Sequence, residues 1–205
     1  MKRKLENYVW HKEEIKFNKL GLFIGDEPVM QYWEKPLMKR LAHIVTETKG
    51  DVLECGFGLG LSASEIIKSG CKSYTVIEAH PEIAENAKVW GKKQKVKVTV
   101  INDYWQNAVK KLTKKFDAIL FDTYPLSEEE RSKNHYPFIP QAFKLLKKGG
   151  LLTYYSDETK SFRQEHLHIL LEHYKTVTLE RFDIKPPKSC VYWGSDHMII
   201  PIAKK

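Results

Sequence analysis

The residue whose type and position could most clearly do chemistry is an acid at the end of an apolar segment. Residues 116–121 are largely apolar, and they are followed by Asp122, Thr123, Tyr124 and a proline. The pattern predicts a buried strand that delivers one carboxylate to the edge of a sheet, where ligands bind in open α/β proteins. A carboxylate placed there can bind a cation and accept a proton. The alternative for Asp122 is a turn-forming aspartate.

A glycine-rich turn upstream predicts a nucleoside-binding site at the same edge. Gly56, Gly58 and Gly60 follow a short apolar segment and precede a helical pattern. Glycines let the backbone turn tightly and approach a ligand closely, and the free N–H groups at the start of a helix face that ligand. Dinucleotide sites place their third glycine one residue later. Glu54, just before the turn, would repel a pyrophosphate but suits the ammonium or sulfonium of S-adenosylmethionine.

Further cofactor residues are predicted after the next two strands. Glu78 ends the second strand, where an acid accepts hydrogen bonds from two ribose hydroxyls; a surface glutamate is the alternative. Asp103 follows the third strand and is placed to accept from an adenine amine, or else forms a turn with Asn102. Trp105 completes the predicted cofactor set. Methyl transfer needs no metal, and the cysteines and histidines show no metal-ligand spacing.

From residue 50 onward, apolar runs alternate with helical patterns. Such alternation predicts a parallel, doubly wound sheet. After a helix over 162–174, strands over 176–182 and 190–202 follow without an intervening helix, which predicts an antiparallel hairpin. The predicted fold is therefore α/β, a Rossmann-like class I methyltransferase with a seven-stranded, mostly parallel sheet and a C-terminal antiparallel hairpin. The other strands are expected over 51–55, 73–77, 96–101, 116–121 and 151–155, and the other helices over 61–69, 81–91, 105–112 and 136–146.

The length of 205 residues suits a single structural domain. Within it, residues 1–49 are predicted to form a helical lid or substrate segment, with the clearest helix over 36–45, and residues 50–205 the methyltransferase domain. No stretch approaches the ~20 apolar residues of a membrane span, and the N-terminus lacks the apolar core of a secretory signal. Three cysteines without a pairing pattern favour a reduced, cytoplasmic location.

The formal net charge of +8 comes mostly from lysines, which are densest over 92–95 and 110–115. Clustered lysines neutralise phosphates, so nucleic-acid binding is one interpretation. These runs lack arginine and interleaved aromatic residues, which favours a solvated surface instead. The Asn/Asp-Pro-Pro-Tyr clamp that holds an exocyclic base amine is also absent after the fourth strand.

Five segments of the chain resemble guanidinoacetate N-methyltransferases, including the one with a phenylalanine between its glycines. The resemblance covers roughly residues 20–205. The relatives include creatine-forming enzymes, protein arginine δ-N-methyltransferases and methyltransferases of free arginine-like metabolites. The resemblance implies S-adenosylmethionine as the cofactor, S-adenosylhomocysteine as its product, and no metal. The segments are residues 29–38, 52–58, 121–128, 145–154 and 186–192.

The resemblance also implies that Glu34 and Asp122 are the catalytic pair and grip the guanidinium of the acceptor. A guanidinium has a pKa above ~12, and its nitrogens are poor nucleophiles while the charge is delocalised. Two carboxylates can bind it through paired hydrogen bonds, and Asp122 can take its proton. Taken alone, Glu34 is equally an acid favoured at the start of a helix. The resemblance adds Met38, Thr123, Tyr124, Thr153 and Tyr154 on the substrate side, with Trp10 as the candidate for an N-terminal tryptophan that covers the pocket.

One segment departs from the creatine-forming enzymes. In the relatives, the residues after the fifth strand meet the acceptor's carboxylate, whereas Asp157 and Glu158 would repel one here. The predicted acceptor is the guanidino group of a small molecule: guanidinoacetate, arginine or an arginine-derived metabolite. The alternatives are a protein arginine, a nucleic-acid amine, or a catalytically silent cofactor-binding protein. The expected partner is the small guanidino substrate, without membrane or nucleic acid, and a homodimer is left open.

Overall fold

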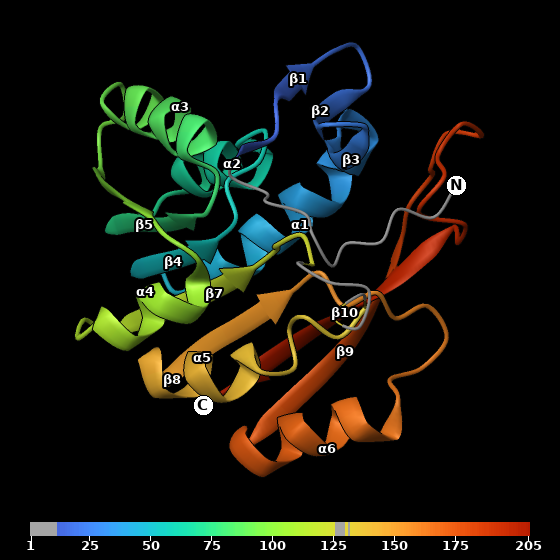
Figure 1. Ribbon diagram of the computed structural model, residues 1–205. Coiled ribbons are helices and arrows are strands. Elements are labelled where there is room, and N and C mark those ends of the chain that lie inside the picture. Colours follow the sequence, from blue (N-terminus) through green and yellow to red (C-terminus); the bar gives the residue numbers. More distant parts are fainter. Residues whose placement is uncertain (1–11, 126–129, 131) are drawn as a thin grey trace.

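The computed structural model describes residues 12–125, 130 and 132–205, and these residues form two sheets (Figure 1). The larger sheet has seven strands in the order β6-β5-β4-β7-β8-β10-β9. Trp10 and the end of the 121–128 segment lie outside the described residues. Among the described residues, no helix combines the length and apolar composition needed to cross a membrane.

Five strands of the large sheet are parallel, which confirms the predicted doubly wound core. The register pairs Cys55 with Ile77 on one side and with Phe121 on the other, so neighbouring strands end at the same level. The segments after these strands therefore meet at one edge of the sheet. The parallel strands are β4 (Asp51–Cys55), β5 (Ser73–Glu78), β6 (Lys97–Asn102), β7 (Phe116–Phe121) and β8 (Leu146–Tyr154).

The predicted C-terminal hairpin closes the sheet. It consists of β9 (Thr176–Asp183) and β10 (His197–Lys204), and β10 is antiparallel to both β9 and β8. The last strand starts at His197 and not at residue 190, so residues 190–196 belong to the connection between the two strands. β8 starts at Leu146, earlier than predicted, and the basic residues 147–148 belong to that strand and do not end the preceding helix.

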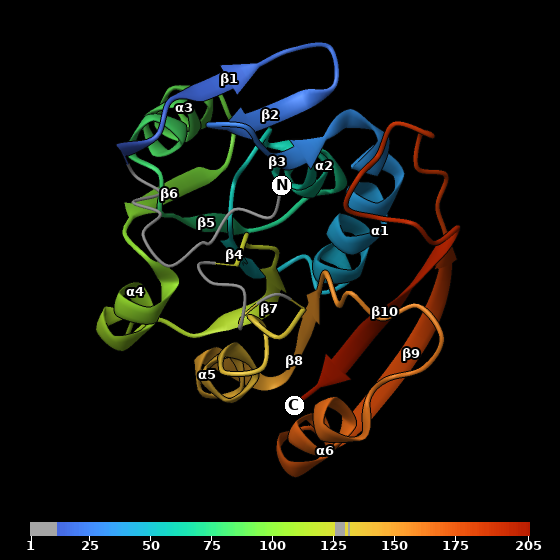
Figure 2. The same ribbon diagram turned by 45° about the vertical axis from the view of Figure 1, so that its right-hand side comes forward.

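Helices cover both faces of the large sheet, as Figure 2 shows. Because side chains alternate along a strand, Val52 packs into one core and Leu53 into the other. The first core lies under three helices and the second under the other three. The first set is α1 (Lys35–Thr46), α2 (Leu61–Ser69) and α3 (Pro81–Gly91), and the second is α4 (Trp105–Lys111), α5 (Phe138–Leu145) and α6 (Gln164–His173).

The N-terminal segment differs from the prediction of helical elements. Apart from a short 3-10 turn over Tyr32–Glu34 and α1, the described part forms a three-stranded antiparallel sheet in the order β1-β2-β3. Gly25, with φ +59°, turns the chain between two apolar runs, which is a pattern typical of a hairpin. The division of the domain at residue 49 stays a prediction. The three strands are β1 (Ile15–Phe17), β2 (Gly21–Ile24) and β3 (Glu27–Gln31).

Candidate active site

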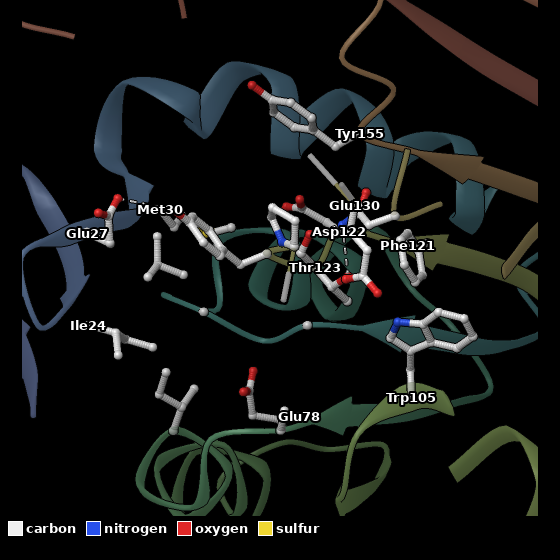
Figure 3. A pocket seen from close by; sticks show the side chains of 18 of the residues that line it. Ile24, Glu27, Met30, Glu78, Trp105, Phe121, Asp122, Thr123, Glu130 and Tyr155 are labelled. Atoms are coloured by element: carbon white, nitrogen blue, oxygen red, sulfur yellow. Dashed lines mark hydrogen bonds between the residues drawn. The ribbon is translucent and has the colours of Figure 1, made fainter. Parts of the chain in front are cut away.

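A cavity of about 540 Å³ lies at the edge where β4, β5 and β7 end. Figure 3 shows Glu78 and Trp105 on one side of it and Tyr155 on the other, with Asp122 between them. The lining includes parts of the glycine turn, of β2 and β3, and of the segment that precedes β10. Although the chain is strongly basic, no lysine, arginine or histidine is found among the described lining residues. Within the described part of the chain, seven acids line it: Glu27, Glu34, Glu78, Asp103, Asp122, Glu130 and Asp157.

The glycine turn brings the backbone against the cavity because two of its residues have no side chain. Gly56 has φ +89°, and a Cβ there would lie 1.9 Å from the main-chain oxygen of Asp122. Gly58 has φ +52°, and a Cβ there would meet the sulfur of Met30 at 3.1 Å. Both glycines line the cavity as predicted. Gly60 is not among the lining residues and instead precedes the first turn of α2, with φ +69°.

Glu78 reaches the cavity with both carboxylate oxygens fixed by main-chain donors. The N–H groups of Phe57 and His80 each donate to one oxygen, at 2.8 Å. Burial raises the pKa of Glu78, and these backbone hydrogen bonds oppose that rise. The N–H of Gly58 also acts on this carboxylate. A carboxylate has about four acceptor positions, so it keeps room for a further donor such as a ligand hydroxyl group.

The segment after β6 supplies four residues to the cavity, and two of them, Tyr104 and Gln106, were not predicted from the sequence. Asp103 and Trp105 line it as predicted. The carboxylate of Asp103, however, already accepts from Asn107 at 3.1 Å and from Lys111 at 2.9 Å. Gln106 also lines the cavity, and its Oε1 is buried with no hydrogen-bond partner among residues 12–125, 130 and 132–205. No motif in the sequence distinguishes this glutamine from its polar neighbours.

Glu54 does not line the cavity, so its predicted direct contact with the cofactor is corrected. Its side chain is fully buried, and the hydroxyl groups of Ser62 and Tyr74 donate to its two oxygens. Burial raises the pKa of this carboxyl to about 7. The reason is the alternation of side chains along β4, which turns Glu54 toward α2 and β5 and away from the end of the strand.

Glu34 enters the cavity from the turn between β3 and α1. Its side chain is 5% exposed, and Oε1 accepts from the N–H of Gln31 and from the hydroxyl of Tyr192, both at 2.7 Å. Trp33 Nε1 donates to both Gln31 Oε1 and the Tyr192 oxygen, at 2.9 and 3.2 Å. Burial raises the pKa of Glu34 to about 7 despite these donors. The second oxygen, Oε2, has no hydrogen-bond partner within the described part of the chain.

Asp122 follows β7 and lines the same cavity as Glu34. Its N–H donates to the carbonyl of Cys55 at 2.9 Å, which ties the residue to the end of β4. Among the described residues, no donor is bonded to its carboxylate. Burial raises its pKa well above the ordinary range, and the charges of Glu34, Glu54 and Asp157 raise it further. Two acids far apart in the sequence thus share one cavity, and each would be stabilised by a cation.

The predicted substrate-side residues divide into two groups. Thr123 and Tyr124 line the cavity, and the Tyr124 hydroxyl donates to Glu27 at 3.2 Å. Met38, Thr153 and Tyr154 do not line it, and all three are fully buried. Met38 lies on the buried face of α1, whereas the other two lie within β8, before the chain reaches the edge of the sheet.

The residues beyond β8 reach the cavity in place of Thr153 and Tyr154. They are Tyr155 and Asp157, and Tyr192 and Trp193 meet them from the connection between β9 and β10. The rings of Tyr155 and Trp193 are in edge-to-face contact, with centroids 5.7 Å apart. The motif around residues 186–192 pointed toward this region without identifying these contacts.

The sequence of this chain is similar to those of known methyltransferases. The sequence matches the guanidinoacetate N-methyltransferase family over residues 6–205. Protein arginine N-methyltransferase 2 of Candida glabrata is 34% identical over 104 residues, which are 47% of this chain and 25% of that protein. The enzyme of the same name from Aspergillus oryzae is 34% identical over 100 residues, 47% of this chain and 24% of that protein. The match thus spans about a quarter of the length of these relatives.

Solved structures agree on the fold. Spermidine synthase from Thermotoga maritima superimposes with a TM-score of 0.64 at 15% identity, over 93% of this chain and 68% of that one. An O-methyltransferase from Bacillus cereus, in complex with SAH, superimposes with a TM-score of 0.58 at 15% identity, over 82% of this chain and 80% of that one. At these identities the likeness establishes the architecture alone.

Proposed function

The chain belongs to the guanidinoacetate N-methyltransferase family, and we propose that it transfers a methyl group from S-adenosylmethionine to a nitrogen of a small guanidino compound. The resemblance found in the sequence is thereby confirmed at the level of the family. The observation that carries the proposal is that Glu34 and Asp122 line one cavity together with the glycine turn and Glu78. An anionic acceptor site thus lies beside a nucleoside-type site.

The residues on the cofactor side fit S-adenosylmethionine. Gly56 and Gly58 line the cavity with main chain alone, because a Cβ at either position would meet Asp122 or Met30. The carboxylate of Glu78, fixed by main-chain donors, suits the ribose hydroxyls. Trp105 offers an aromatic face to the adenine, and the unpartnered Oε1 of Gln106 suits an adenine amine better than the occupied carboxylate of Asp103. When bound, the cofactor supplies a methyl carbon that a guanidino nitrogen attacks as the carbon–sulfur bond breaks.

On the acceptor side, Glu34 and Asp122 have different roles. Glu34 is held by Gln31 and Tyr192, so its free Oε2 can hold a guanidinium in one orientation. The carboxylate of Asp122 has no bonded donor among the described residues, and its raised pKa makes it the better proton acceptor. The proton that leaves the methylated nitrogen therefore passes to Asp122. The guanidino group is a cation before and after methylation, whereas the sulfonium becomes a neutral thioether. The charge balances because the released proton neutralises the carboxylate of Asp122.

A protein arginine is the second candidate acceptor, and the relatives named as protein arginine N-methyltransferases favour it. A nucleic-acid amine fits less well, because a cavity lined by seven acids would repel the phosphates next to the base. A single-turnover assay with labelled cofactor separates the candidates when it compares free guanidino compounds, arginine-rich peptides and single-stranded nucleic acid. Labelling confined to peptides would replace the small-molecule proposal.

The role of Asp122 is tested by Asp122→Asn, which keeps the shape of the side chain and removes the proton acceptor. We expect turnover to fall by ~10²–10⁴-fold, the usual contribution of a general base, with cofactor affinity within severalfold of wild type. The matched control is Glu85→Gln, because that side chain is 60% exposed on α3. Wild-type turnover in Asp122→Asn would show that another group takes the proton.

A further inference from the structure

We propose that the end of the large sheet opposite the cavity binds the phosphate backbone of double-stranded nucleic acid without reading its sequence. This end lies where β4, β5 and β7 begin and where β10 finishes, next to the C-terminus marked in Figure 2. The inference is independent of the proposed methyl transfer, which takes place at the other end of these strands. It is carried by exposed lysines that come from separate segments, most of them outside the two lysine runs of the sequence.

Three lysines lie at this end on the β6 side of the sheet. Lys97 opens β6 and pairs with Ser73, the first residue of β5. Lys72 precedes Ser73, and its N–H donates to the carbonyl of Gly50, directly before β4. Lys49 comes immediately before that glycine. All three lysines are exposed.

Four more lysines continue across the sheet to β9. Lys115 directly precedes β7, and Lys148 lies near the start of β8. Lys204 is the last residue of β10 and pairs with Leu151 of β8. The N–H of Lys175, directly before β9, donates to the carbonyl of Lys204 at 3.2 Å. These four are also exposed, so each strand of the sheet has an exposed lysine at or next to the same end, and the seven residues form a lysine row.

A structural role accounts for two members of the lysine row. Lys49 donates to a carbonyl at the end of α2, and Lys115 donates to one at the end of α5. Cations there also interact favourably with the helix dipoles. As far as the structure describes the chain, the side chains of the other five make neither a hydrogen bond nor an ion pair, and they are therefore available to a ligand. The five are Lys72, Lys97, Lys148, Lys175 and Lys204.

The two ends of the sheet carry opposite charges. Near the lysine row, Asp51 and Asp117 both pair with Lys147. Glu47 follows α1 and Glu172 lies in the last turn of α6, close to the same end. The described lining of the cavity, by contrast, holds seven acids and no basic residue. A polyanion is therefore attracted to the lysine row and repelled from the cavity, which it leaves open.

The shape and composition of the lysine row favour a duplex over a single strand or a membrane. Neighbouring strands lie ~4.8 Å apart, so the row is ~29 Å long, the length of about eight base pairs. Proteins that bind single strands stack the bases on aromatic side chains, and helices that lie on membranes insert apolar ones. The exposed aromatic residues of the described chain, Phe17 and Tyr32, belong to the N-terminal segment instead. Lysines contact phosphates as point charges, which gives no sequence preference.

The salt dependence of duplex binding tests the proposal. If the five available lysines each neutralise one phosphate, the slope of log affinity against log salt is about −4.5, so binding of a short labelled duplex weakens ~500-fold from ~50 to ~200 mM KCl. The combined variant Lys72→Gln, Lys97→Gln, Lys148→Gln and Lys204→Gln keeps one of the five, and we expect it to lose only ~4-fold over the same range. Fluorescence anisotropy measures both affinities.

The matched control removes the same charge from exposed lysines elsewhere, in the N-terminal segment, in α1 and in the connections after β8 and β9. It combines Lys19→Gln, Lys39→Gln, Lys160→Gln and Lys185→Gln, and it should keep the salt dependence of wild type. Calorimetry with S-adenosylhomocysteine checks that both variants are folded, since none of the substituted residues lines the cavity.

Three results would overturn the proposal. The first is duplex binding by wild type that does not depend on salt. The second is an equal loss of salt dependence in the two variants, which would mean that net charge alone attracts the duplex. The third is binding to vesicles that contain phosphatidylserine without binding to the duplex, which would assign the lysine row to a membrane surface. None of these results bears on methyl transfer.

Discussion

Replacing Glu54 by glutamine tests whether the buried carboxyl affects the stability of the fold or the binding of the cofactor. Glu54 lies between α2 and β5, and both of its oxygens accept from hydroxyl groups, those of Ser62 and Tyr74. Glutamine has the same shape, and the hydroxyls can rotate so that one of them accepts from the new amide. The substitution therefore removes the ionisation of the side chain with little change in packing.

The magnitude follows from the pKa. In the folded protein the pKa of Glu54 is about 7, against an ordinary value of 4.5. Below 4.5 the group is protonated in both states. Between 4.5 and about 7 the unfolded chain ionises while the folded chain keeps its proton, so stability falls as the pH rises. At ~1.4 kcal/mol per pH unit, the loss amounts to ~3 kcal/mol and is complete above about pH 7.

Urea unfolding at about pH 5 and about pH 8 measures the effect. Wild type should lose ~3 kcal/mol more than Glu54→Gln between these two conditions, because the other titrating carboxyls are common to both proteins. Cofactor affinity should stay within severalfold of wild type, since Glu54 does not line the cavity. Glu85→Gln is the control, because its exposed carboxyl carries no cost of burial. Parallel stability curves for wild type and Glu54→Gln would refute the burial argument, and a large loss of cofactor affinity would restore the predicted contact.

Three further substitutions test separate parts of the site. Gly56→Ala should destabilise the protein by ~2 kcal/mol or more in urea unfolding, because its Cβ would lie 1.9 Å from the Asp122 oxygen at a positive φ; wild-type stability would mean that the turn relaxes. Glu78→Ala should weaken cofactor binding by ~1–3 kcal/mol in calorimetry, and unchanged affinity would exclude Glu78 from the ribose site. Tyr192→Phe removes a donor to Glu34 and raises the pKa of that carboxyl, so the KM for the acceptor should rise ~10-fold, and more at lower pH, with cofactor affinity unchanged. If the KM of Tyr192→Phe has the same pH dependence as that of wild type, Tyr192 does not have that role.

Much of the fold was predictable because its signals are local. A buried parallel strand is an apolar run, and the helix that follows begins at a proline or after a glycine, so β4, α2, α3 and β7 have the predicted bounds. The positions of Gly56 and Glu78 at the cavity were predictable for the same reason, since Gly56 follows β4 directly and Glu78 is the last residue of β5. The N-terminal sheet was not predicted although Gly25 marks its hairpin, because its strands are only three to five residues long and give too short an alternation to recognise.

Asp122 and Glu54 show where the sequence by itself is sufficient and where it is not. Asp122 comes one residue after β7 and lines the cavity. Glu54 lies inside β4, and the alternation of side chains turns it toward α2 and β5, away from the cavity. The sequence determined that an anionic group and a glycine turn meet at one edge, because parallel strands end together. Only the tertiary structure decided that Tyr192 fixes Glu34, that Gln106 keeps a free oxygen, and that no basic residue is found in the described lining. These depend on contacts between segments distant in the chain, for which neighbouring residues carry no signal.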